Sequence, residues 1–185
     1  ATRHASGPRR EIGIRTIFNI LGPLTNPANA DCQLMGVFEK SKVQTCAEVL
    51  KRLGVKRAMV VHSEDGLDEI SIYAKSHIAE LRENEITLYQ VNPSDYDFMG
   101  KNPSALYAAG VKDSLEIILR TFEGEPGDAH KIVAINAGAA IYLGGLASDL
   151  LSGIKKASDL LTTGSAKNNF QKFIRKTQEL SQNQK

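Results

Sequence analysis

The chain has 185 residues, of which 42% are hydrophobic and 24% charged, a composition typical of a globular domain with one sizeable core. Its 23 basic and 21 acidic side chains nearly cancel, so there is no strong positive field to attract nucleic acid. No apolar stretch reaches the roughly 18 residues of a membrane-spanning helix. We therefore expect a soluble protein whose partners are small molecules, with no nucleic acid and no membrane among them.

The chain contains two cysteines, Cys32 and Cys46. They form no CxxC motif and have no set of histidines nearby, so the spacing does not indicate a metal site. We expect both to be reduced side chains that serve in packing, which is usual in the cytoplasm.

The first 30 residues are rich in turn signals. Residues 1–12 are polar and basic around one expected helix turn, which Gly13 would end. Residues 16–21 are short and apolar, and the pairs Gly22-Pro23 and Asn26-Pro27 predict turns. We expect a structured loop in this part of the chain.

Residues 32–61 predict a strand, a helix and a second strand. The strands are the apolar runs at 32–38 and 58–61, and the helix begins with a capping-box spacing at Ser41 and Gln44. Its apolar stripe is Val43, Cys46, Ala47, Leu50 and Leu53. This order is typical of a right-handed βαβ unit. It predicts the α/β fold class, with a central, mostly parallel sheet flanked by helices.

The remaining sequence extends this pattern. We expect two strands and then four helices at residues 69–73, 87–91, 114–122, 128–146, 147–161 and 165–180. The helix at 114–122 has an apolar face that should pack on the sheet. The segment 128–146 is apolar nearly all round, which indicates a core helix.

An acidic segment follows the predicted strand at 58–61 and includes Asp65, Asp68 and Glu69. Ligands of open α/β sheets bind beyond the carboxyl ends of strands, so these side chains lie where a site is expected. Adjacent carboxylates repel each other when ionised, and a cation relieves this cost. Asp68 and Glu69 offer the hard oxygen ligands that Mg²⁺ accepts. On spacing alone, an acidic surface turn is the more common explanation.

Three arginines, Arg9, Arg10 and Arg15, precede the Gly22-Pro23 turn. Arginine can hold a carboxylate or a phosphate through two parallel hydrogen bonds. Solvated arginines at a helix end explain the cluster equally well. The turn itself is not a Walker A loop or a dinucleotide-binding loop, because both of these lead a Gly-rich turn directly into a helix.

Isolated polar residues give little evidence of a functional site. His4 and His62 have no nucleophile at a suggestive position, and His62 is better explained as capping a strand end. Asn136 lies in the predicted core helix and needs hydrogen-bond partners, because an unpaired buried amide costs about 1–3 kcal/mol. It either holds the helix to the sheet or contacts a substrate.

Five segments in order resemble the anthranilate phosphoribosyltransferases. They begin with residues 9–19, which read RREIGIRTIFN, and continue with GPLTNP at 22–27, QLMGVF at 33–38, VVHSEDGLDEIS at 60–71 and INAGAAIYLGG at 135–145. The resemblance implies transfer of a 5-phosphoribosyl group from phosphoribosyl pyrophosphate to anthranilate in tryptophan biosynthesis. It also implies the α/β domain of the nucleoside phosphorylase-like phosphoribosyltransferases, with residues 1–185 as the C-terminal part of that catalytic domain.

The same resemblance assigns roles to particular residues. Asp68 and Glu69 match the family's Mg²⁺ ligands, which makes Mg²⁺ the expected cofactor. Arg9 matches the arginine that contacts anthranilate, and Gly22 and Pro23 match the loop that lines the path of the aromatic substrate. No residue is assigned to proton transfer or nucleophilic attack.

The resemblance has one departure. The family's glycine-rich phosphoribosyl pyrophosphate loop, its KHGN-type segment and its N-terminal helical domain have no counterpart and should precede Ala1, so we expect a fragment that is inactive alone. The expected partners are the two substrates, the missing N-terminal part and a second copy in a full-length homodimer. A pyrimidine nucleoside phosphorylase and a non-catalytic nucleic-acid-binding relative remain as alternatives.

Overall fold

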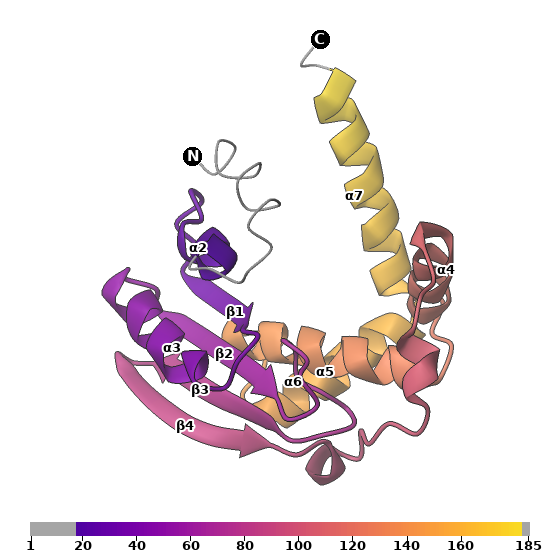
Figure 1. Cartoon of the computed structure of the whole chain (residues 1–185). Coiled ribbons are helices and arrows are strands. Elements are labelled where there is room, and N and C mark those ends of the chain that lie inside the picture. Colours follow the sequence, from indigo (N-terminus) through magenta and orange to yellow (C-terminus); the bar gives the residue numbers. More distant parts are fainter. Residues whose placement is uncertain (1–17, 183–185) are drawn as a thin grey trace, which may run out of the picture. The chain divides into compact units, whose positions relative to one another are not determined.

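The computed structural model of the protein describes residues 18–182. The chain divides into two compact units whose boundary lies between Ala30 and Asp31. Figure 1 shows the helices and strands in chain order. In the described part of the chain, no helix is both long enough and apolar enough to cross a membrane.

The first unit contains the short helix α2 (Phe18–Leu24) and a turn. Gly22 and Pro23 lie inside this helix, so the loop predicted for them is wrong. Proline fixes φ near the helical value, which permits its place there. The predicted turn at Asn26 is confirmed, because its Oδ1 accepts a hydrogen bond from the N–H of Ala28 at 3.0 Å. The helix turn expected in residues 1–12 lies outside the described residues.

The second unit contains a four-stranded sheet in the order β1-β2-β3-β4. The strands are β1 (Cys32–Gly36), β2 (Arg57–Ser63), β3 (Ser76–Arg82) and β4 (Glu85–Val91). β1 and β2 are parallel, but β3 is antiparallel to both β2 and β4. The α/β class is confirmed, whereas the sheet is mixed and not mostly parallel.

A tight turn explains the antiparallel half of the sheet. Glu83 and Asn84 join β3 to β4, and both have positive φ, at 52° and 63°. Two residues in this conformation form the hairpin turn that matches the twist of antiparallel strands. Asparagine tolerates this conformation better than most residues do.

The predicted strand at 69–73 is wrong. These residues belong to the connection between β2 and β3, and the N–H groups of Ile70 and Ser71 donate to side chains and not to a neighbouring strand. The apolar side chains in this segment are explained by burial of Ile70 and Ile72 in the core. An anchored loop and a strand can therefore share one hydrophobic pattern.

Helix α3 (Lys42–Arg52) connects β1 to β2, as predicted, and packs on β2 and β3. Its buried residues confirm most of the predicted stripe: Val43, Cys46, Ala47 and Leu50. The predicted capping box is wrong, because Ser41 has helical φ and ψ and makes no side-chain cap. Its hydroxyl donates to the Glu39 carboxylate.

The two cysteines differ in environment. Cys46 is buried on α3, and this burial raises the pKa of its thiol. Cys32 is exposed at the start of β1, so the packing role predicted for it is wrong.

Helices α4 to α7 follow the sheet in the chain (Figure 1). They are α4 (Val111–Phe122), α5 (Asp128–Leu143), α6 (Leu150–Thr162) and α7 (Ser165–Gln182), preceded by the 3₁₀ turns η2 (Pro93–Tyr96) and η3 (Pro103–Leu106). The main neighbours of α4 are α5, α6 and α7, and its apolar residues Leu115, Ile118 and Leu119 are exposed. The prediction that it packs on the sheet is wrong.

Helices α5 and α6 form the most extensive pair of elements in the unit. A Cβ on Gly138 would lie 2.5 Å from the Cα of Ile154, and one on Gly153 would overlap the carbonyl oxygen of Gly138. Only glycine allows the two backbones to approach so closely. The core on the sheet side of this pair includes Met59, Val61, Ile78, Ile135, Leu143 and Ile154. The core helix predicted at 128–146 is confirmed as α5.

Candidate functional site

The acidic loop, residues 64–75, connects the carboxyl end of β2 to β3. It carries Asp68 and Glu69, and both side chains are exposed. The two residues line one pocket of about 400 Å³. The rest of the lining comes from the sheet and from one face of α5: Leu34, Gly36, Val61, Ile132, Val133, Asn136 and Ala137. The structure thus brings the two predicted metal ligands together at the end of a strand.

A cluster of three fully buried serines holds the acidic loop from inside. The hydroxyl oxygens of Ser63 and Ser76 lie 2.6 Å apart, and both accept from the N–H of Ser71, at 3.1 and 3.0 Å. Ser63 also donates to the backbone carbonyl of Glu69. Because buried polar groups are costly unless paired, this network fixes one path for the loop backbone.

Ser71 and Asp65 form a further hydrogen bond within the same loop. The Ser71 hydroxyl donates to Asp65 Oδ2 at 2.5 Å and accepts from the N–H of Tyr73 at 2.9 Å. Asp65 is therefore engaged in the loop itself, which distinguishes it from Asp68 and Glu69.

Gly36, at the end of β1, lies against the acidic loop. A Cβ at this position would overlap the backbone carbonyl oxygen of Asp68. Any side chain here would displace the loop, since backbone atoms cannot move aside as a flexible side chain can. The glycine of the QLMGVF segment therefore sets how close Asp68 comes to the sheet.

Asn136 joins α5 to the acidic loop. Its Oδ1 accepts from the N–H of Ile70 at 2.9 Å, and its Nδ2 donates to the carbonyl oxygens of Ile70 and Ile132, each at 2.9 Å. The amide is fully paired, as the sequence required. The partner is the loop that carries the acidic pair.

The carboxylates of Asp68 and Glu69 have no partner within residues 18–182. Among residues 18–182, no side chain or N–H donates a hydrogen bond to either carboxylate, and neither forms an ion pair. The same residues contain no group of three His, Cys, Asp or Glu side chains that could hold a metal by itself. Two carboxylates with further positions left to water and phosphate oxygens are the donor set that Mg²⁺ uses. The residues present fit that ion.

His62 lies at the end of β2, just before the acidic loop. His62 Nδ1 lies 2.9 Å from the carbonyl oxygen of Val37, which ties the ends of two strands together and agrees with the expected capping role. Gly22 and Pro23 are exposed on α2, in the first unit. Arg9 and His4 lie outside the described residues.

The buried serines and Gly36 were not predicted from the sequence. Serines are common in surface turns, so Ser63, Ser71 and Ser76 gave no signal that they meet in the core. Gly36 did leave a signal, because a glycine within an apolar strand often marks a close approach of another backbone.

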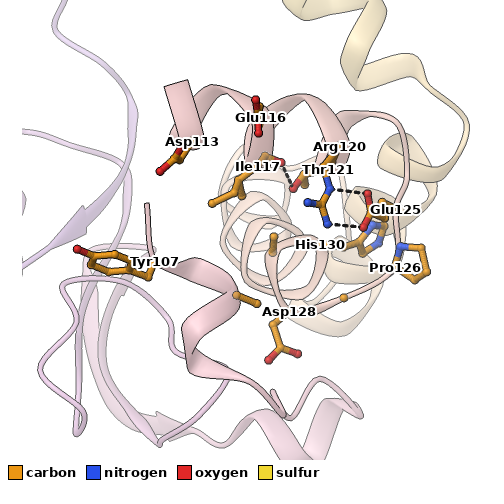
Figure 2. Close-up of a pocket in the computed structure, with 13 residues that line it drawn as sticks. Tyr107, Asp113, Glu116, Ile117, Arg120, Thr121, Glu125, Pro126, Asp128 and His130 are labelled. Atoms are coloured by element: carbon orange, nitrogen blue, oxygen red, sulfur yellow. Dashed lines mark hydrogen bonds and ion pairs between the residues drawn. The ribbon is translucent and has the colours of Figure 1, made fainter. Parts of the chain in front are cut away.

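A second pocket of about 450 Å³ lies between η3, α4 and the start of α5, and Figure 2 shows its lining. Asp128 Oδ2 accepts from the N–H groups of Lys101 and Asn102, at 2.8 and 2.6 Å, and from the hydroxyl of Tyr73, at 3.0 Å. Burial acts to raise the pKa of Asp128, but these donors outweigh it and the pKa is lowered. Burial, and then the bond to Asp128, raises the pKa of Tyr73 to about 12.

Two other titratable side chains of the second pocket, Arg120 and His130, contact neighbouring side chains. Arg120 donates two hydrogen bonds to the Glu125 carboxylate, at 2.7 and 2.6 Å. His130 Nε2 lies 2.9 Å from the hydroxyl of Ser158, and burial lowers the pKa of this imidazole. None of the residues predicted for chemistry lines this pocket.

Comparison with known proteins identifies the family. Residues 1–167 match the sequence profile of the glycosyl transferase family, a/b domain. The chain belongs to this glycosyl transferase family. Among individual proteins, it is 48% identical over 182 residues to anthranilate phosphoribosyltransferase of Halorhodospira halophila, a match that covers 98% of this chain and 53% of the relative. The resemblance noted in the motifs is confirmed.

Solved structures agree with this family membership. The anthranilate phosphoribosyltransferase of Thermus thermophilus is 34% identical, with a TM-score of 0.85 over 94% of this chain and 51% of that one. The Saccharomyces cerevisiae enzyme in complex with PRPP and Mg is 22% identical, with a TM-score of 0.83 over 94% of this chain and 50% of that one, and supports the fold alone. The chain spans about half the length of the curated glycosyl transferase relatives that it matches.

Proposed function

We propose that this chain forms part of an anthranilate phosphoribosyltransferase. The reaction moves the 5-phosphoribosyl group of phosphoribosyl pyrophosphate to the amine of anthranilate. The C1′–O bond breaks, and pyrophosphate leaves with the electron pair. The C1′–N bond forms, and the amine loses a proton. The observation that carries the proposal is the acidic pair, unpaired among the described residues and exposed on a pinned loop of this family's fold.

We assign Mg²⁺ binding to Asp68 and Glu69. Mg²⁺ would neutralise the negative charge of the pyrophosphate group when bound. Two points support the assignment: both carboxylates line the same pocket, and the two residues match the metal ligands of the family's motif. The chain's own contribution is to hold the backbone of both residues fixed while the carboxylates remain available.

We assign anthranilate binding to the N-terminal unit. The Arg9 guanidinium would hold the anthranilate carboxylate through two parallel hydrogen bonds, which fixes the amine in one orientation. Gly22 and Pro23 would line the path of the aromatic ring. Support comes from the match of these residues to the family's motif, and the exposure of Gly22 and Pro23 on α2 is compatible with it.

The proposal includes the partners of the full-length protein. The chain spans about half of its relatives' length, so the phosphate-binding loop and the helical domain would come from the remaining part. We expect a homodimer in the cytoplasm, in the tryptophan pathway. Most of the rate acceleration would come from orientation and charge stabilisation.

A direct assay tests the proposal. The full-length protein is incubated with anthranilate, phosphoribosyl pyrophosphate and Mg²⁺. N-(5-phosphoribosyl)anthranilate and pyrophosphate are measured by chromatography, and we expect them to form in equal amounts. Parallel reactions omit the metal or replace anthranilate with benzoate, which lacks the amine. Failure to form the product would refute the proposal. Phosphorolysis of thymidine, or tight salt-sensitive binding of single-stranded DNA, would favour the alternatives instead.

A further inference from the structure

We infer that Asn136 is a positioning residue for the acidic pair, and that it acts through the peptide unit between Glu69 and Ile70. This inference rests on the proposed function, because it concerns the same metal site. It assigns Asn136 no contact with substrate or metal. Its role would be to hold the Glu69 backbone so that both carboxylates meet one ion.

The peptide unit between Glu69 and Ile70 is held at both of its polar ends. Its carbonyl oxygen, which belongs to Glu69, accepts from the buried hydroxyl of Ser63. Its N–H, which belongs to Ile70, donates to Asn136 Oδ1 at 2.9 Å. Ser63 comes from the end of β2, and Asn136 comes from the middle of α5. The sheet and the helix therefore fix this one peptide plane from two directions.

The next backbone group along the loop is held by the same amide. Asn136 Nδ2 donates to the Ile70 carbonyl oxygen at 2.9 Å, so one planar group binds both polar atoms of Ile70. Two bonds from one rigid amide fix an orientation, whereas one bond fixes only a distance. Aspartate cannot replace it because a carboxylate offers acceptors only, and alanine removes both bonds.

The preceding residue is fixed by steric contact. The Asp68 carbonyl oxygen lies where a Gly36 side chain would be, so Asp68 cannot move toward the sheet. Ile70 is fully buried in the core and closes the other end of the segment. The backbone of the acidic pair is thus restrained on each side, although both side chains are exposed.

The backbone of the acidic pair is restrained, whereas its carboxylates have no partner in the described part of the chain, and this contrast suggests more than packing. Ile70 alone would anchor the loop to the core, whereas an apolar residue at position 136 would leave the N–H and the carbonyl oxygen of Ile70 without these partners. Asparagine also has a poor helix propensity, costing several tenths of a kcal/mol relative to alanine. The presence of an amide at this position is explained if it holds the metal-binding residues in place. Loss of such a supporting contact typically lowers metal affinity or activity by about 10- to 100-fold.

The test compares Asn136→Ala with a control on the same helix. Tyr142→Phe removes a hydrogen bond from Tyr142 to Glu80 (2.7 Å), away from the acidic loop. In the full-length protein, Mn²⁺ affinity in the presence of pyrophosphate is measured by electron paramagnetic resonance. The kcat, the Mg²⁺ concentration that gives half-maximal rate and the melting temperature are measured separately for each variant. We expect Asn136→Ala to weaken Mn²⁺ binding about tenfold and raise the Mg²⁺ requirement. The KM for anthranilate should stay within twofold of wild type. Tyr142→Phe should change only the melting temperature.

A second variant keeps the inference testable if Asn136→Ala does not fold. Ser63→Ala removes the bond on the opposite side of the same peptide unit and should give the same metal-specific defect. The inference is overturned if neither variant changes Mn²⁺ affinity beyond the Tyr142→Phe control. This result differs from failure of the proposed function, in which the wild-type protein forms no phosphoribosylanthranilate and Asp68→Asn leaves Mn²⁺ affinity unchanged.

Discussion

The backbone carbonyl of Asp68 lies against the Cα of Gly36, in the space that a side-chain methyl would fill. Gly36 lies on a strand and Asp68 on a loop, 32 positions further along the chain. Their backbones thus meet without a side chain between them. This contact determines where the acidic pair lies relative to the sheet, and it leads to the first prediction.

Gly36→Ala should displace the acidic loop. Overpacking of this kind costs about 1–3 kcal/mol of stability, and the moved carboxylates should lower kcat and raise the Mg²⁺ requirement. Urea denaturation and steady-state kinetics measure the two effects. Gly110→Ala is the matched control, since a Cβ there meets open space. Wild-type metal dependence in Gly36→Ala would mean that the contact does not position the pair.

Asp68→Asn and Glu69→Gln should reduce turnover far more than stability. Both side chains are exposed and unpaired among the described residues, so each change should shift the free energy of unfolding by less than about 0.5 kcal/mol. Turnover should fall at least about 100-fold, which corresponds to loss of about 2.7 kcal/mol of transition-state stabilisation. Glu116→Gln, another exposed acid, serves as the control. Unchanged Mg²⁺ dependence in both variants would contradict the metal assignment.

Arg9→Ala should raise the KM for anthranilate with a smaller effect on phosphoribosyl pyrophosphate. Loss of a bidentate contact to a carboxylate removes about 1.5–3 kcal/mol of binding, or roughly 10- to 150-fold in KM. Arg9→Lys should restore little, because an ammonium group cannot form the two parallel bonds. Initial rates at varied concentrations of each substrate separate the two KM values. Equal changes in both would argue against a specific carboxylate contact.

His130 should make stability depend on pH in mildly acidic solution. Burial lowers the pKa of its imidazole in the folded state, so the unfolded chain binds the proton more tightly. Stability is therefore full above the unfolded pKa of about 6.5 and is lost as the pH falls from there toward the lower folded pKa. Urea denaturation at several pH values should show a steeper loss in wild type than in His130→Gln. Identical slopes would show that His130 does not contribute.

The sequence predicts the parts of the fold that depend on local pattern. Helices α3, α5, α6 and α7 follow from apolar spacing, and the parallel pair β1 and β2 follows from the strand-helix-strand order. Strand β4 and helix α4 match the predictions at 87–91 and 114–122, but β3 and the antiparallel pairing were not predicted, because their cause is the conformation of Glu83 and Asn84 and not periodicity. The false strand at 69–73 has a different cause, because burial of Ile70 in an anchored loop gives the apolar pattern of a strand.

The candidate site divides in a similar way. Asp68 and Glu69 could be proposed from the sequence because two adjacent acids after a buried strand give a local signal, to which the family resemblance adds the metal role. Ser63 and Gly36 were not found, because their role depends on partners elsewhere in the chain. The contact between Asn136 and Ile70 spans 66 positions, and no spacing rule relates such residues.

The bond between Ile70 and Asn136 has a consequence for the motion of the loop. An amide hydrogen in a segment without regular secondary structure normally exchanges with solvent quickly. The hydrogen of Ile70 is bonded to a side chain from α5, and its residue is fully buried. It should exchange only when the core opens, as slowly as the hydrogens of β2. By this measure, the part of the loop beside the carboxylates is as persistent as a strand.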